Sequence, residues 1–195
     1  MTVMSQLCSD SPAPVASRAA CRLSRAGWCL VAGLIALGAC TPAQNWREVR
    51  FDDARWIGWL PCKPDRAQRT VDLGGHPAQL RLMGCQADGM DFTLAQLHLP
   101  ATLSATQAQQ AWKTASLSSF QATGDVPSQD LALVGASPVM RPQRVVAQGG
   151  QGQSAHWVWF AYDGQLYQAA VYARASRTSQ AERAMDNLLS GLRLP

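Results

Sequence analysis

Side chains that could carry out acid–base, nucleophilic or metal chemistry are few and scattered along this sequence. The three histidines, His76, His98 and His156, form no pair with the spacing of metal ligands, and neither H-x-x-x-H nor C-x-x-C occurs. No G-x-S-x-G nucleophile elbow is present, because Gly135-Ala136-Ser137 is followed by Pro138. We therefore expect structural or surface histidines, no catalytic residues, no metal site, no cofactor and no enzymatic activity.

The acidic and glycine-rich stretches favour turns over chemistry. Asp52 and Asp53 are adjacent in the chain, and Asp88, which could pair with Asp91, falls in a turn, so solvated positions are expected for all of them. The run from Gly149 to Gly152 lacks the Lys-Ser/Thr and the helix that follow a phosphate-binding loop, which indicates a hairpin turn.

Three tryptophans close to the start of the expected domain allow two interpretations. Trp46, Trp56 and Trp59 could touch a membrane interface or a partner, because the indole ring is apolar with one polar end. Aromatic side chains also dominate protein cores, and core packing is the role we expect for them.

The stretch from residue 18 to residue 41 has the order of a secretory signal peptide. Arg18, Arg22 and Arg25 come first, an uncharged apolar run over residues 27–39 follows, and small residues end it. The apolar run has 13 residues, whereas a membrane-spanning helix needs about 20. The segment is therefore interpreted as a cleaved signal rather than a transmembrane helix.

The end of this segment, Leu37-Gly38-Ala39-Cys40, resembles the lipobox of bacterial lipoproteins. The resemblance implies that Cys40 gains a diacylglycerol thioether, that the signal is cut before it, and that its new amino group is acylated. Several acyl chains would hold the protein firmly at a membrane. Thr41 follows where inner-membrane lipoproteins commonly have aspartate, so the resemblance favours the outer membrane, on its periplasmic face.

Length and charge then limit the domain organisation and the binding partners of the mature protein. The chain has 195 residues, of which 1–39 are the expected signal, 40–45 a lipidated tether and 46–195 one domain with an apolar core. Removal of the signal takes away three arginines and Asp10, which leaves 14 basic and 12 acidic residues of the original 17 and 13. A domain this close to neutral gives no electrostatic argument for nucleic-acid binding.

Two of the six cysteines remain as a candidate disulfide. Cys8, Cys21 and Cys29 lie in the signal, and the lipobox resemblance assigns Cys40 to lipidation. Cys62 and Cys85 are then a lone pair in an exported domain, which predicts a bond between them. Two separately buried thiols are the alternative. A redox centre is disfavoured, since reactive pairs usually occur as C-x-x-C at a helix start.

Alternating apolar residues and turn signals predict a domain built mainly of strands. Gly74-Gly75 and Asp163-Gly164 are hairpin signals, and the strands flanking the second are the most apolar pair in the domain. That pair is expected at the centre of the sheet, with both faces covered. The expected strands span residues 55–60, 68–73, 76–86, 90–99, 139–148, 155–162 and 165–175. Residues 46–51 are expected to form either a first strand or an irregular lead-in.

Two amphipathic helices are expected among these strands. Ser104 and Gln107 make a capping box before the first, with Gly124 as its end signal. Ser179 and Glu182 make a second box before the other, and Gly191 can cap its end. Its apolar stripe consists of Ala181, Ala184, Met185, Leu188 and Leu192.

The order of strands, helix, strands and helix indicates the α+β class. We expect an antiparallel β-sheet of about six to seven strands with the two amphipathic helices packed on it. This element order, over residues 46–195, resembles the PsbP-like layered sandwich, and it is also similar to that of small bacterial lipoproteins such as the DcrB type. The resemblance rests on element order, so it assigns no functional residue.

Two functions remain open from the sequence. The first is a non-enzymatic binding or envelope-assembly module, anchored to the membrane through lipid at Cys40, with an envelope protein as its candidate partner. The second is a small-ligand carrier or an enzyme whose site is assembled from residues distant in sequence. A pocket with convergent polar groups would favour the second, and a filled core with a flat apolar surface patch the first.

Overall fold

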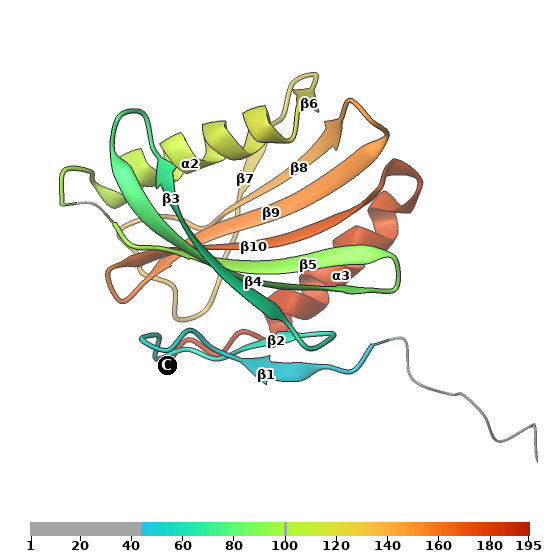
Figure 1. Cartoon of the computed structure of the whole chain (residues 1–195), viewed down its shortest axis with the longest axis horizontal. Helices are drawn as coiled ribbons and strands as arrows, with labels where there is room; N and C mark the ends of the chain where they lie inside the picture. The colour runs from blue at the N-terminus through green and yellow to red at the C-terminus, as the bar shows by residue number, and fades with distance from the viewer. Residues whose placement is uncertain (1–43, 100) are drawn as a thin grey trace, which may run out of the picture. The chain divides into compact units, whose positions relative to one another are not determined.

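A computed structural model describes residues 44–99 and 101–195 of the chain, and the expected signal and Cys40 lie outside these residues. The domain is built on an antiparallel sheet of eight strands (Figure 1) in the order β3-β4-β5-β10-β9-β8-β6, with β7 also paired to β8. The strands are β3 (Asp65–Asp72), β4 (Pro77–Ala87), β5 (Met90–Leu97), β6 (Ala122–Thr123), β7 (Ser128–Asp130), β8 (Gln143–Gly149), β9 (Gln153–Tyr162) and β10 (Gln165–Arg174). The expected α+β antiparallel class is therefore confirmed.

Both predicted hairpins form, and their turn residues supply the backbone conformation that a tight reversal needs. Gly74 and Gly75 between β3 and β4 have φ of 71° and 91°, and Asp163 and Gly164 between β9 and β10 have φ of 48° and 74°. Left-handed φ at both central positions matches the twist of the flanking strands, which favours glycine and aspartate there.

The β9–β10 hairpin lies inside the sheet, as its composition predicts. β10 pairs with both β5 and β9, and β9 pairs with β8 on its other side. All but the first residue of β9 are buried. Two separate apolar clusters, one on each face of the sheet, account for this double burial.

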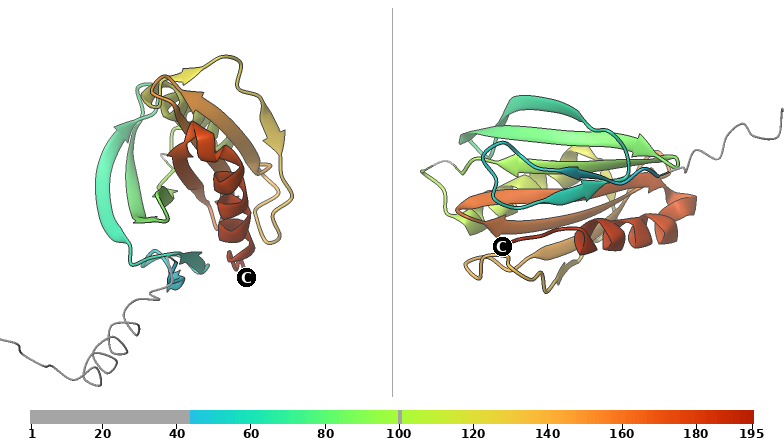
Figure 2. Two further views of the ribbon diagram at one scale, coloured as in Figure 1. Left: turned by 90° about the vertical axis from the view of Figure 1, so that its right-hand side faces the viewer. Right: turned by 90° about the horizontal axis from the view of Figure 1, so that it is seen from below.

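Each helix covers one face of the strongly curved sheet (Figure 2). Helix α3 (Thr178–Ser190) packs on one face through Ala181, Ala184, Met185 and Leu188, the stripe expected from its spacing. Helix α2 (Ala105–Ser119) packs on the other face through Ala108 and Trp112.

The helix ends agree with the sequence in one case and differ in the other. Ser104 caps α2 through its side chain, and Gln107 returns the bond to the Ser104 backbone, so the first capping box is confirmed. The second box is wrong, because the chain enters α3 through a 3-10 turn, η1 (Ala175–Arg177), and Ser179 is already inside the helix. Gly124 does not end α2, which stops at Ser119; its φ of 76° serves a turn after β6.

The chain before β3 forms a separate small sheet rather than the expected long strands. β1 (Arg47–Val49) pairs only with β2 (Gly58–Leu60). The other residues of ranges 46–51 and 55–60 lie just before β1 or between β1 and β2, where Ile57 forms an isolated bridge to Arg193. This β1–β2 pair covers the same sheet face as α3 and lies at the far side of the domain from α2 (Figure 1).

Prolines set the start of two strands. β3 begins directly after Pro64, and β8 begins directly after Pro142, because proline cannot donate a ladder hydrogen bond. Neither a helix nor a strand forms over residues 131–134. Among the described helices, none has the length and apolar character needed to span a bilayer.

Candidate functional site

A pocket of about 250 Å³ lies between α2 and the sheet face that α2 covers; we call it the α2 pocket. Its walls combine four aromatic rings with hydroxyl, amide and guanidinium groups from elements far apart in the chain. The lining residues are Arg69, Leu80, Leu82, Thr93, Trp112, Ser116, Ser119, Phe120, Trp157, Gln168 and Tyr172.

Small side chains in the middle of the sheet leave room for this pocket. Ala170 of β10 sits in register between Trp157 of β9 and Thr93 of β5. The Ala170 methyl group is much smaller than the neighbouring Trp157 indole, so the sheet surface that faces α2 is uneven. Thr93 and Trp157, the two register neighbours of Ala170, both line the pocket.

Polar atoms inside the α2 pocket are held by one another. Gln168, only 5% exposed, donates from Nε2 to the Ser116 hydroxyl at 3.2 Å. Trp157 donates from Nε1 to the Tyr172 hydroxyl at 3.1 Å. Burial raises the pKa of Tyr172, so its hydroxyl keeps its proton at neutral pH and can donate to a further acceptor.

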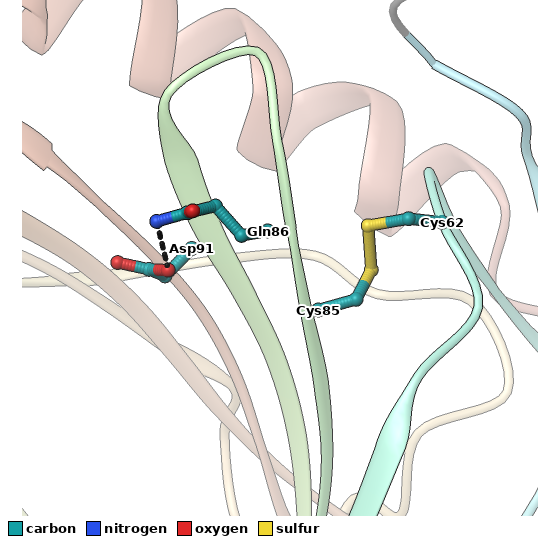
Figure 3. Close-up of a disulfide and its surroundings, with 4 residues drawn as sticks. All are labelled: Cys62, Cys85, Gln86 and Asp91. Carbon is teal, nitrogen blue, oxygen red and sulfur yellow. Dashed lines mark hydrogen bonds between the residues drawn. A yellow bond between two sulfur atoms is a disulfide. The ribbon is translucent and has the colours of Figure 1, made fainter.

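Arg69 is the one charged residue in the lining. Its guanidinium forms no side-chain hydrogen bond or ion pair with any described residue, although it lines a pocket that contains four aromatic rings. The nearby carboxylate of Asp91 accepts a hydrogen bond from Gln86 at 3.1 Å (Figure 3) and belongs to a neighbouring hollow. The pocket therefore offers an uncompensated positive charge at its edge.

A second, more open hollow of about 500 Å³ lies between the β1–β2 pair and the end of α3; we call it the β1–β2 groove. Trp46 and Trp59 contribute to it, Trp59 being 37% exposed. Its residues are Trp46, Glu48, Ile57, Trp59, Asn187, Ser190, Gly191 and Arg193.

The three tryptophans near the start of the domain thus have two different roles. Trp56 is fully buried and packs edge-on against Phe160 and Tyr167, as the core interpretation predicts. Trp59 is exposed in the β1–β2 groove, so the core interpretation does not hold for it. Trp46 lines the same groove but is half-buried and packs edge-on against the core residue Phe92.

A row of polar side chains crosses the sheet beneath the loop between β1 and β2. Arg81, Gln96 and Tyr167 are neighbours in register on β4, β5 and β10. Asp53 of the loop accepts from Gln96 Nε2 at 3.1 Å and pairs with Arg81 at 2.9 Å, and His98 Nε2 lies 3.5 Å from its other oxygen.

The electrostatics of this row favour ionised Asp53. Burial acts to raise the pKa of Asp53, but the Gln96 hydrogen bond, its own backbone and the charges of Arg81 and His98 outweigh it and lower the pKa. Gln96 is fully buried, and its Oε1 atom has no partner among the described residues. The row fixes the loop to the sheet, and it presents no nucleophile beside a base.

The disulfide expected between Cys62 and Cys85 is present (Figure 3), with the two Cα atoms 5.9 Å apart. Cys62 follows β2 and Cys85 lies within β4, so the bond joins the β1–β2 pair to the main sheet. Strands β2 and β4 do not pair with each other. Both sulfurs belong to half-buried residues packed against the core that contains Trp56.

The other candidate residues from the sequence remain apart from one another. His76 lies near the β3–β4 turn, with Nδ1 2.9 Å from the Thr102 hydroxyl, while His156 is buried under α3. Within residues 44–99 and 101–195, no group of three or more His, Cys, Asp or Glu side chains could hold a metal ion. Gly150 and Gly152 lie in the turn between β8 and β9, as expected. Cys40 falls outside the described residues.

Sequence reasoning did not identify the α2 pocket or the polar row. Gln168, Tyr172 and Arg69 appear in the sequence as ordinary strand residues, and they share a wall only because β3, β5 and β10 lie in one sheet. One signal was available: Gln168 interrupts a strand that is otherwise almost entirely apolar or aromatic. A polar residue at a buried strand position usually has a partner on the facing element.

No protein-family model and no curated protein matches this sequence. Among solved structures, the chain is similar to the solution structure of cyanobacterial PsbP (CyanoP) from Synechocystis sp. PCC 6803. The two share 10% sequence identity with a TM-score of 0.48, over 82% of this chain and 99% of that one. The assignment to the α+β class rests on the strand order and helix placement of this chain itself.

Proposed function

We propose that this protein is a non-enzymatic binding module held by lipid at Cys40 on the periplasmic face of the outer membrane. The lipobox residues Leu37-Gly38-Ala39-Cys40 support the anchor. The Cys62–Cys85 disulfide in the described domain fits an oxidising compartment outside the cytoplasm. The observation that carries the proposal is the β1–β2 groove, an open surface site at the start of the domain.

The proposed occupant of this groove is the phospholipid surface to which the anchor attaches. Trp46 is six residues after Cys40, so even a fully extended tether spans only about 20 Å. Trp46 and Trp59 both line the groove, and tryptophan favours the membrane–water interface because its ring is apolar and its N–H is polar. Arg193 in the same groove suits anionic headgroups.

The anchor is tested by replacing Cys40 with serine in cells that are labelled with a fatty-acid analogue. We expect uncleaved precursor and no label on the C40S variant, while wild type is labelled and sediments with membranes. The C29S variant, in the expected signal, is the matched control and should be processed normally. Label that persists on C40S would contradict the lipoprotein assignment.

Contact between the β1–β2 groove and the bilayer is tested by tryptophan fluorescence of the lipidated mature protein in phosphatidylethanolamine–phosphatidylglycerol vesicles. The acyl chains of these vesicles carry bromine, which quenches tryptophan fluorescence. We expect W46F and W59F each to remove part of the quenchable signal. Trp112 of α2 is buried against the opposite sheet face, so W112F should leave the quenched part unchanged. Equal quenching in W46F, W59F and wild type would mean that the groove does not touch the bilayer.

A second candidate function, a small-ligand carrier, is favoured by one specific observation. The α2 pocket brings the buried amide of Gln168 and the free guanidinium of Arg69 together on the sheet face opposite to the β1–β2 pair. A module seated on the membrane by the β1–β2 groove would keep this pocket away from the lipid surface.

A further inference from the structure

We infer that the α2 pocket binds a small aromatic carboxylate. This inference rests on the proposed role as a binding module and adds the class of its ligand. The pocket volume of about 250 Å³ is slightly below the roughly 300–1,000 Å³ of sites for drug-sized molecules, so its ligand is a single ring with a short acidic side chain.

The charge of the ligand follows from Arg69. Its guanidinium has no acidic partner among the described residues, and the lining contains no carboxylate. A planar guanidinium binds a carboxylate through two parallel charge-assisted hydrogen bonds, which are stronger than those to a neutral acceptor, and it repels a cation. The ligand is therefore an anion whose acidic end meets Arg69.

Two hydroxyl groups in the same lining as Arg69 can donate hydrogen bonds to the ligand's carboxylate. The Tyr172 hydroxyl accepts from Trp157 and makes no donated hydrogen bond to a described residue, so its proton is available. The Ser116 hydroxyl accepts from Gln168 in the same way and keeps its own proton for another acceptor. These donors suit the oxygen atoms of a carboxylate.

The aromatic character of the ligand follows from the walls. Trp157 and Tyr172 stand edge-to-face with ring centroids 6.0 Å apart, and Phe120 packs edge-on against Trp157 at 5.3 Å. Trp112 of α2 forms the facing side. A ring inserted among these side chains would make the edge-to-face contacts that aromatic groups prefer, and an alkyl chain would not.

The test is isothermal titration calorimetry of the complete mature protein, from Cys40 onward, with phenylacetate. Arg69→Gln should weaken phenylacetate binding about tenfold or more, because a charge-assisted hydrogen bond is lost. The matched control is Arg66→Gln, three residues earlier on the same strand, whose guanidinium bonds the Arg50 carbonyl and lies outside the pocket. R66Q should bind phenylacetate as wild type does.

Three further titrations define the ligand class. Tyr172→Phe, with a melting temperature measured beside it, should weaken binding several-fold while the domain stays folded. Cyclohexylacetate and phenylacetamide should bind at least about tenfold more weakly than phenylacetate, since the first lacks the aromatic ring and the second the charge. Inorganic phosphate should not compete with phenylacetate.

Several outcomes would overturn the inference. They are no phenylacetate binding at millimolar concentration, equal weakening by R69Q and R66Q, or equal affinity for cyclohexylacetate or phosphate. None of these outcomes depends on the anchor, because the same titration of the uncleaved, unlipidated C40S precursor should give the wild-type affinity. Loss of lipidation in that variant tests the proposed membrane role, whereas loss of phenylacetate binding in R69Q tests the pocket.

Discussion

At the scale of single residues, His156 is a buried titratable group whose environment differs strongly from water. It is 1% exposed, and neither ring nitrogen has a hydrogen-bond partner among the described residues. Burial lowers the pKa of His156, and the charge of Arg144 lowers it further, while Glu182 and Asp186 of α3 act in the opposite direction. The neutral imidazole is therefore the folded form at physiological pH.

The free energy of unfolding should consequently fall as pH falls below about 6.5, the ordinary pKa of histidine in the unfolded chain. Between the lowered folded pKa and 6.5 the unfolded state binds more protons, so this stability is present at higher pH and is lost on acidification. The slope for one group is at most about 1.4 kcal/mol per pH unit.

Urea unfolding at pH 7.5 and 5.0 measures this effect. The H156Q variant should lose much of the difference between the two pH values, whereas H76Q, changed near the surface turn, should keep it. The difference between the unfolding free energies at pH 7.5 and 5.0 is the quantity to compare. If H156Q and H76Q changed this difference by the same amount, the assignment to His156 would be wrong.

At the scale of elements, local signals and long-range ties stabilise different parts of the domain. Ser104 begins α2 with a reciprocal cap that involves only residues three positions apart. The Cys62–Cys85 bond instead holds the β1–β2 pair on the main sheet across a chain separation of 23 residues.

Removal of the α2 cap should cost about 1 kcal/mol of the free energy of unfolding, because S104A leaves a helix N–H without its side-chain acceptor. The matched control is S118A, at an exposed position inside the same helix, which should be neutral or slightly stabilising since alanine has the higher helix propensity. Chemical denaturation of both variants gives the two values. Equal destabilisation would argue against the cap.

Loss of the disulfide should cost about 3 kcal/mol, the chain-entropy value for a closed loop of this length. The C62A/C85A double variant should unfold at lower urea than wild type, and reductant should destabilise wild type but not the double variant. Intact mass after alkylation without reductant should show no modified thiol in the wild-type domain. Two alkylated cysteines there would contradict the bond.

At the scale of the whole domain, two separate cores share one sheet. The cluster under α3 and the β1–β2 pair lies on one face, and the cluster under α2 lies on the other. Strands β9 and β10 contribute to both, so opening either strand disrupts both clusters.

Amide hydrogen exchange should therefore be slowest in β9 and β10 and should report the global free energy of unfolding there. The edge strand β3, in which seven of eight residues are exposed, should exchange much faster. Mass spectrometry of peptides after timed exchange compares these strands directly. Fast exchange across the β9–β10 hairpin would show that it is not the cooperative centre.

Several parts of this structure follow from sequence alone because their causes are local. The Ser104–Gln107 cap, the Asp163–Gly164 turn and the apolar stripe of α3 each depend on residues a few positions apart. The α+β class follows because segments with the alternating pattern of strands are interspersed with segments that have the spacing of amphipathic helices. The Cys62–Cys85 bond also followed, because removal of the expected signal leaves so few cysteines to pair.

Tertiary structure decided what local patterns do not contain. The residues from 55 to 60 have strand composition, yet packing of Trp56 into the core and the bridge from Ile57 to Arg193 leave only Gly58–Leu60 as β2 in a separate sheet. Arg69 and Gln168 meet in one pocket only because curvature and strand order bring β3, β10 and α2 together. Such sites depend on contacts between residues far apart in the chain, and no short window of sequence specifies those contacts.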